Sequence, residues 1–201
     1  MERGGAADHR RELLAGLSGR VIEVGAGNGL NFAHYPPEVT HVLAVEPEPY
    51  LRAIAVRSAH SARTSVEVVD GVADQLPAAD GSFDAVVASL LLCSVSDQPV
   101  VLREMFRVIR PGGQLRFFEH VRADTPGLYR VQRLLDATVW PALGGGCHAS
   151  RDTAAAIEHA GFTLQRLDHL RFPDMRLPLP TSPHILGVAA RPQRPAVRQE
   201  Q

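Results

Sequence analysis

The chain has 201 residues, of which 45% are apolar and 21% charged, so it is long enough for one compact domain with its own core. The net charge of −1 and the absence of lysine exclude a strongly basic nucleic-acid surface and any lysine-dependent chemistry. Two cysteines, Cys93 and Cys147, are too few for a disulfide framework, which favours a reducing, cytoplasmic location.

The two ends of the chain differ in composition from the middle. Residues 1–8 are small and polar, and residues 191–201 are rich in Pro, Arg and Gln, so we expect both segments to be flexible. The first residues lead into no apolar stretch, and no apolar run reaches about 18 residues, which predicts a protein without a signal peptide or membrane anchor. The expected domain therefore spans residues 9–190.

Short apolar runs alternate with helical patterns through this domain. The predicted strands are 20–24, 41–45, 65–69, 83–89, 114–119, 163–167 and 184–190, and the predicted helices are 10–17, 29–34, 49–60, 98–109, 127–139 and 151–160. Strands separated by single helices are typical of βαβ units. The sequence therefore predicts an α/β fold, a Rossmann-like, doubly wound and mostly parallel seven-stranded sheet with helices on both faces.

The segment between the fifth and sixth predicted strands, about 121–150, is the expected small helical cap. Apolar residues recur at helical spacing from Leu128 and Val131 to Trp140. The simplest interpretation of this pattern is a helix whose apolar face packs against the core. Two local signals mark the next helix: Ser150 is a suitable N-cap, and Gly161 stands where a left-handed C-terminal cap belongs.

The most specific motif follows the first predicted strand, where V-I-E-V-G-A-G-N-G at 21–29 is a buried strand that runs into three glycines at every second position. Glycine permits a tight turn and a close approach of a ligand, and a helix beyond it would offer free N–H groups to a carboxylate. A nicotinamide or flavin fingerprint would need glycine at position 30, where this chain has Leu30. The pattern resembles that of class I S-adenosylmethionine-dependent methyltransferases. The resemblance implies S-adenosylmethionine as cofactor, bound by Glu23, Gly25, Ala26, Gly27 and Gly29.

Further matches to this class follow in order along the chain. Glu46 ends the second strand, where such folds place an acid on the two ribose hydroxyls, and Pro47 comes next. The string D-G-V-A-D at 70–74 follows the third strand, where the class binds adenine. The class often has an acid at the position of Val72, so either Asp74 or backbone contacts serve the adenine amine here. The expected adenine loop and the end of the fourth strand add Gly71, Val72, Ala73, Asp74, Ser89 and Leu90 to the cofactor site.

Five short strings narrow the resemblance. They are N-F-A-H-Y-P-P at 31–37, L-L-C-S-V at 91–95, F-E-H-V at 118–121, G-C-H at 146–148 and P-H-I-L-G at 183–187. Together they make the chain similar to the methyltransferase-like 7 family, the animal thiol S-methyltransferases and their bacterial relatives. The animal members carry an N-terminal membrane anchor, and this sequence shows none. The resemblance implies methyl transfer to a small lipophilic acceptor, with a thiol as the first candidate.

Other functions stay open at this point. A phenol, quinone or amine could be the acceptor of an O-, N- or C-methyltransferase, and an intact cofactor site is also compatible with a non-catalytic scaffold. A nucleic-acid substrate is disfavoured by the charge.

The candidate catalytic residue is His120, which follows the fifth strand at the edge where ligands bind in open α/β sheets. It could act as a base, orient the acceptor, or serve only as a structural histidine. The other candidate substrate contacts are Tyr35 after the glycine turn, Cys93 as a small apolar wall, and Tyr129, Trp140 and Leu143 in the cap.

No metal site is expected from the cysteines and histidines. Cys147 and His148 are adjacent, so in an extended chain their side chains point in opposite directions, and no other Cys/His cluster lies near them in the sequence.

Overall fold

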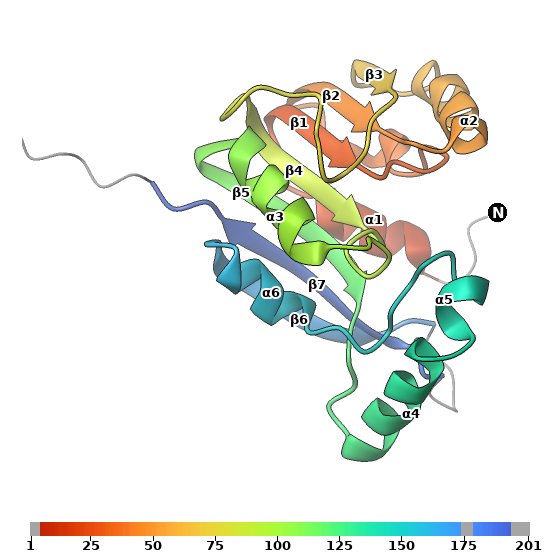
Figure 1. Cartoon of the computed structure of the whole chain (residues 1–201). Helices are drawn as coiled ribbons and strands as arrows, with labels where there is room; N and C mark the ends of the chain where they lie inside the picture. Colours follow the sequence, from red (N-terminus) through yellow and green to blue (C-terminus); the bar gives the residue numbers. More distant parts are fainter. Residues whose placement is uncertain (1–4, 174–178, 194–201) are drawn as a thin grey trace, which may run out of the picture.

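The computed structural model describes residues 5–173 and 179–193, which form a central sheet with helices on both faces (Figure 1). The strand order is β3-β2-β1-β4-β5-β7-β6. Strands β1 to β5 pair in parallel, and β7 runs antiparallel to both of its neighbours. The strands are β1 (Gly19–Val24), β2 (Val39–Val45), β3 (Val66–Val69), β4 (Phe83–Ser89), β5 (Ile109–His120), β6 (Thr163–Arg171) and β7 (Pro183–Ala190). The predicted fold class is confirmed.

Helices bury the sheet from both sides. Helices α1 (Ala6–Leu14) and α2 (Pro49–Ala59) pack on one face, and α3 (Gln98–Val108) and α6 (Thr153–His159) pack on the other. Side chains alternate along a strand, so Val21 joins the core under α1 while its neighbour Ile22 joins the core under α3. This double burial explains why the first strand has apolar side chains on both faces of the sheet, at Val21, Ile22 and Val24.

Three helices begin with an acidic N-cap. Glu48 accepts from the N–H groups of Tyr50 and Leu51 in α2, and Asp97 accepts from that of Val100 in α3. Asp152 accepts from the Ala155 N–H of α6 at 3.2 Å. The predicted N-cap Ser150 is wrong, because its N–H and hydroxyl donate instead to the Asp136 carboxylate. The predicted left-handed cap at Gly161 is confirmed by its φ of +97°.

The predicted helix 29–34 is replaced by one short turn, η1 (Phe32–His34). Gly29 has a φ of +78°, which no right-handed helix allows, and Tyr35 before Pro36 is extended. The expected helix N-terminus for a carboxylate is therefore absent from this segment.

The cap consists of two helices instead of the single predicted helix 127–139. They are α4 (Pro126–Asp136) and α5 (Trp140–Leu143), which lie beyond the carboxyl ends of β4 and β5 (Figure 1). The expectation that the apolar face of α4 turns to the core is wrong, since Val131 is 45% exposed and the fully buried side chain is Gln132. The cap leaves and rejoins the domain at one place, because the Arg122 N–H donates to the Arg151 carbonyl at 3.0 Å.

The ends of the domain differ slightly from prediction. Helix α1 begins at Ala6, inside the segment 1–8 that the sequence marks as flexible. The rest of that segment, residues 1–4, and residues 194–201 of the predicted tail lie outside the described part of the chain.

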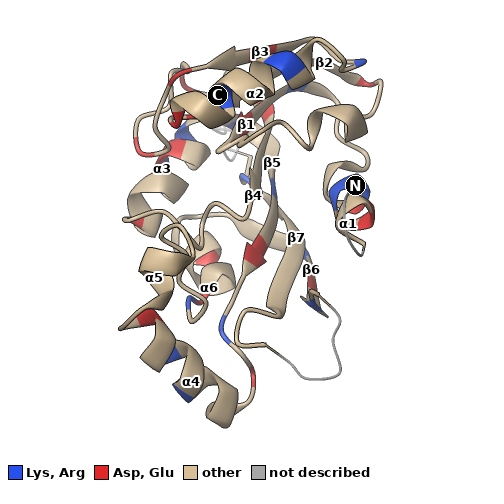
Figure 2. Cartoon of the chain, turned by 90° about the vertical axis from the view of Figure 1, so that its right-hand side faces the viewer, with Lys and Arg blue, Asp and Glu red and all other residues tan. Residues whose placement is uncertain are grey.

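The described surface shows neither a basic element nor a spanning helix. Acidic and basic positions are spread over several elements (Figure 2). Among residues 5–173 and 179–193, no helix combines the length and apolar character that crossing a bilayer requires.

Candidate active site

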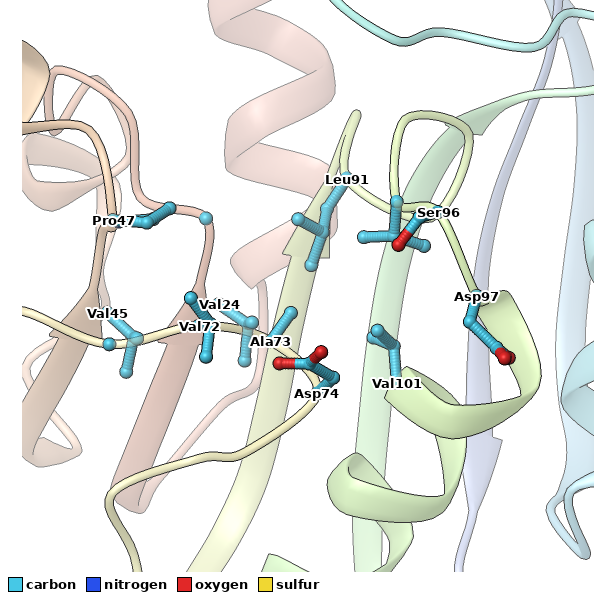
Figure 3. A pocket seen from close by; sticks show the side chains of 13 residues that line it. Val24, Val45, Pro47, Val72, Ala73, Asp74, Leu91, Ser96, Asp97 and Val101 are labelled. Atoms are coloured by element: carbon cyan, nitrogen blue, oxygen red, sulfur yellow. The ribbon is translucent and has the colours of Figure 1, made fainter.

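A cavity of about 250 Å³ lies at the carboxyl ends of β1, β2 and β4 (Figure 3). The strand order reverses here, on either side of β1, which is where open α/β sheets bind their ligands. Its walls are mostly aliphatic, and the Asp74 carboxylate lies among them (Figure 3). The lining residues are Val24, Gly25, Val45, Pro47, Gly71, Val72, Ala73, Asp74, Leu91, Val95, Ser96, Asp97 and Val101.

The glycine turn after β1 is locked to the acid that ends β2. Gly25 has a φ of +69°, and a Cβ there would lie 2.7 Å from the end of the Leu91 side chain, so any other residue would be strained and would displace Leu91. The Gly27 N–H donates to Glu46 Oε2 at 2.7 Å, and the Glu48 N–H donates to Oε1 at 3.0 Å. Each oxygen keeps a further lone pair, so this carboxylate can also accept from the two hydroxyls of a ribose.

A second buried acid supports the turn from below. Glu23 is 2% exposed and accepts from the Tyr35 hydroxyl at 2.7 Å and from the Asn31 amide at 2.8 Å. Burial raises the pKa of Glu23 from 4.5 to about 7, although both hydrogen bonds act in the opposite direction. Glu23 therefore binds a proton in the folded protein at a pH where the unfolded chain releases it.

This pKa predicts a stability that falls as the pH rises. Between about pH 4.5 and 7 the folded state holds more protons than the unfolded state, so the contribution of Glu23 declines through that window. From pH 5.5 to pH 8 the free energy of unfolding should fall by about 2 kcal/mol more in the parent than in Glu23→Gln. Urea unfolding at both pH values measures this difference, with the exposed Glu158→Gln as control. Parallel curves for the parent and Glu23→Gln would contradict the prediction.

The segment after β4 is held by a third buried acid. The Glu119 carboxylate accepts from the N–H groups of Leu91, Leu92 and Cys93 at 2.9 to 3.1 Å. Its side chain is completely buried, and this burial raises its pKa even though the three N–H donors favour the charged form. Glu119 thus fixes the backbone that carries both a wall of the cavity and a cysteine.

Two cysteine sulfurs and one histidine nitrogen lie close together next to this segment. His120 Nδ1 is 3.5 Å from the Sγ atoms of both Cys93 and Cys147, and the three atoms lie within 4.8 Å of one another. A hydrogen bond between the two thiols lowers the pKa of Cys147, and contact with His120 lowers it further. The same hydrogen bond, together with burial, raises the pKa of Cys93. The pair therefore favours a thiolate at Cys147.

A second histidine, His184, packs against His120. The His184 ring packs on the His120 ring with centroids 4.2 Å apart, and His184 Nδ1 contacts the Ser182 carbonyl at 2.9 Å. Burial lowers the pKa of His184 to about 4, so the ring is neutral near pH 7 and donates its Nδ1 proton to that carbonyl.

Comparison with known proteins places this site in a family. A general model of the methyltransferase domain matches residues 22–117. Human thiol S-methyltransferase TMT1A is 38% identical over 197 residues, which cover 92% of this chain and 79% of the human protein. The chain belongs to the thiol S-methyltransferase family. Mouse thiol S-methyltransferase TMT1B is 40% identical over 183 residues, which cover 89% of the chain and 74% of the mouse protein.

Solved structures agree on the fold. An S-adenosylmethionine-dependent methyltransferase from Mesorhizobium loti superposes with a TM-score of 0.68 at 20% identity, covering 94% of this chain and 99% of that one. The chain is therefore an S-adenosylmethionine-dependent methyltransferase, and its cofactor is S-adenosylmethionine. The cavity fits this cofactor, because aliphatic walls suit the adenine ring and Glu46 retains free lone pairs for the ribose.

Only some of the residues that the sequence predicted to bind the cofactor line the cavity of this methyltransferase. Gly25, Pro47, Gly71, Val72, Ala73 and Asp74 do so. Glu23 is buried with its carboxylate on Asn31 and Tyr35, and Ala26 and Gly29 are buried in the turn itself. Gly27 and Glu46 bond to each other beside the cavity. Leu90 is 38% exposed at the end of β4, directly after Ser89, with a left-handed φ of +56°.

The expected substrate residues separate into two groups. Cys93, His120 and Trp140 come together, since the Trp140 indole lies beside the Cys147 sulfur. Tyr35 is buried and its hydroxyl donates to Glu23, away from this group, so its contact with the acceptor stays a prediction. Leu143 is 79% exposed on the cap, and Tyr129 is half-buried on α4.

The sequence analysis missed several residues of the site. Leu91, Val95, Ser96, Asp97 and Val101 line the cavity because α3 begins directly beside it. The pattern D-Q-P at 97–99, an N-cap followed by proline, is the signal that could have located this helix start. Glu119 and the proximity of Cys147 to Cys93 depend on tertiary structure and have no local signal.

Proposed function

We propose that this methyltransferase methylates the sulfur of a small lipophilic thiol. The observation that supports this proposal is the set of side chains near the carboxyl ends of β4 and β5, where we expect the acceptor to bind. The groups gathered there are two cysteines and His120, while the nearby Glu119 carboxylate is occupied by three backbone N–H groups. The named activity of the human and mouse relatives agrees with a thiol acceptor.

A thiol suits an acceptor position whose neighbouring carboxylate, Glu119, already accepts from three backbone N–H groups. The thiol pKa of about 8.5 leaves a few per cent of thiolate at neutral pH, whereas a hydroxyl acceptor needs a strong base in place. Bound S-adenosylmethionine supplies an electrophilic methyl group on a sulfonium. The protein then has to hold the acceptor sulfur in line with that methyl and exclude water.

Residues of the chain divide this work. Glu46 and Asp74 would hold the ribose and the adenine amine, and the turn at Gly25 would let the cofactor approach the backbone. His120 stands at the carboxyl end of β5 as the group that orients the acceptor. The domain 9–190 would be the catalytic unit, with the cap at about 121–150 covering the acceptor.

The location of the reaction is also a proposal. Cys93 and Cys147 are both free, and their free state is the one the site uses, so we place the activity in a reducing compartment such as the cytoplasm.

The test is formation of S-adenosylhomocysteine with five acceptors, namely an alkyl thiol, an aryl thiol, a catechol, a quinol and an amine. We expect turnover with the thiols and turnover at least about 100-fold slower with the others near pH 7, because only the thiols ionise appreciably. Glu46→Ala is the blank, since it should bind the cofactor poorly. Turnover with the catechol, quinol or amine instead would replace the thiol proposal, and saturable cofactor binding without any turnover would favour a scaffold.

A further inference from the structure

We propose that Cys93, His120 and Cys147 form a site for a zinc-like divalent cation, whose fourth position takes the sulfur of the acceptor. The inference rests on the proposed thiol acceptor for the role of the fourth position. The cation site itself depends only on the three side chains. It revises the expectation from the sequence that the chain holds no metal.

The geometry matches tetrahedral coordination. Zinc bonds of about 2.3 Å to sulfur and about 2.05 Å to nitrogen, at the tetrahedral angle, separate sulfur from nitrogen by about 3.55 Å. Both observed separations from His120 Nδ1 are 3.5 Å, and the two sulfurs lie within 4.8 Å of each other. One cation could therefore bind all three atoms without a change in the backbone.

The three ligands are held in place by other contacts. Glu119 fixes the N–H of Cys93, and the His148 N–H donates to the Cys93 carbonyl at 2.7 Å, which joins the two cysteine segments. The Asp136 carboxylate accepts from the N–H groups of Ala149 and Ser150, which anchors the loop carrying Cys147 to the end of α4. A site of this kind is preorganised, so binding a cation would cost little ordering.

The surroundings supply the further contacts that metal sites use. The Trp140 Nε1 atom is buried and has no hydrogen-bond partner among the described residues, and the indole lies beside the Cys147 sulfur, which could accept its proton as a thiolate. An N–H donor of this kind stabilises a metal-bound thiolate. The Arg151 guanidinium donates to the Leu92 carbonyl at 2.7 Å and is close enough to both sulfurs to interact with their charge.

The charges favour an open fourth position for an anion. Two thiolates neutralise a divalent cation, and an acceptor thiolate would add one negative charge, which Arg151 and the sulfonium of the cofactor would balance. Sites with three protein ligands and one exchangeable ligand are the catalytic type of zinc site. Cys93 lies between Leu91 and Val95, which both line the cofactor cavity, so the segment that carries this ligand also forms a wall of the cofactor site.

Methyl transfer at such a site would move one proton, form one bond and break one bond. The acceptor thiol binds the cation as a thiolate and releases its proton to solvent. A lone pair of the bound sulfur forms the new S–CH₃ bond, and the C–S bond of the sulfonium breaks with its electron pair on the sulfur of S-adenosylhomocysteine. The thioether product is neutral, binds zinc more weakly than a thiolate, and leaves.

The first test measures metal in the untagged protein, purified without thiol reductants and kept reduced by a phosphine. We expect about one zinc ion per chain, and less than about a tenth of that in Cys93→Ser and Cys147→Ser. The matched control is His159→Asn, an exposed histidine on α6 that should leave the zinc content unchanged. Binding of S-adenosylhomocysteine by each variant shows that it is folded.

The second test uses cobalt as a visible probe. Cobalt added to the metal-free parent should give the absorption of a tetrahedral thiolate site, and an alkyl thiol should then shift those bands. No zinc above the level of the cysteine variants, or no cobalt thiolate band, would overturn the site. Cobalt absorption bands that do not shift when the alkyl thiol is added would overturn the proposal that the acceptor sulfur occupies the fourth position.

These readouts separate the cation site from the proposed function. Metal content and cobalt spectra can be measured without turnover. If the protein binds zinc but methylates none of the five acceptors, only the proposal of a thiol acceptor is refuted. His120→Ala adds a kinetic criterion. Loss of a ligand should reduce thiol methylation at least about 10-fold at both pH 7 and pH 9, whereas recovery at pH 9 would make His120 a simple base and overturn its role as a ligand.

Discussion

Glu46→Ala should weaken the binding of S-adenosylmethionine about 100-fold or more. The carboxylate would lose two hydrogen bonds to the ribose, and hydrogen bonds to a charged group contribute about 1.5 to 3 kcal/mol each. The substitution also leaves the N–H groups of Gly27 and Glu48 without their acceptor, which loosens the glycine turn itself. Isothermal titration with S-adenosylhomocysteine measures the change in Kd.

Two variants control this measurement. Glu46→Gln keeps the shape and one oxygen, so its affinity should fall between those of the parent and the alanine variant. Glu67→Ala removes an exposed acid from the neighbouring strand β3 and should bind like the parent. A Kd for Glu46→Ala within about threefold of the parent would remove Glu46 from the cofactor site.

Glu119→Ala should lower the free energy of unfolding by about 4 kcal/mol. The N–H groups of Leu91, Leu92 and Cys93, the last two of them buried, would lose a single shared acceptor. Each unsatisfied buried donor costs about 1 to 3 kcal/mol before water relieves part of it. Urea unfolding at pH 7 measures the loss. The variant should also bind S-adenosylhomocysteine more weakly, because Leu91 lines the cavity.

The control for Glu119 is an acid of the same type outside any network. Glu158→Ala, exposed on α6, should change the free energy of unfolding by less than about 0.5 kcal/mol. Glu119→Gln retains one acceptor oxygen and should lose about half as much stability as Glu119→Ala. A loss below about 1 kcal/mol for the alanine variant would mean that water replaces the carboxylate without cost.

The parts of the molecule that sequence reasoning predicted well are those with a local pattern. The apolar run 21–24 and the glycines after it required a buried strand and a tight turn, and the structure has both. Spacing along the chain also located the loops that line the cofactor cavity. Even so, Gly29 misled the prediction of a helix, because its left-handed conformation is invisible in the sequence.

The parts that failed depend on contacts between distant segments. Cys93 and His120 are 27 residues apart, and His120 and Cys147 another 27, so no spacing rule for metal ligands includes them. In the cap, the apolar residues of α4 suggested a buried face. Gln132 is buried instead, because its amide bonds the backbone at Ala123 and Val121.

The single backbone hydrogen bond between Arg122 and Arg151 has a consequence for how this family can diversify. Since the cap begins and ends at adjacent points, its length and sequence can change without shifting the register of any strand. Exchange of residues 123–150 between homologues would therefore transplant one cysteine and the whole acceptor cover as a module, while the nucleotide half stays constant. Acceptor range and cofactor use are thus free to evolve at different rates.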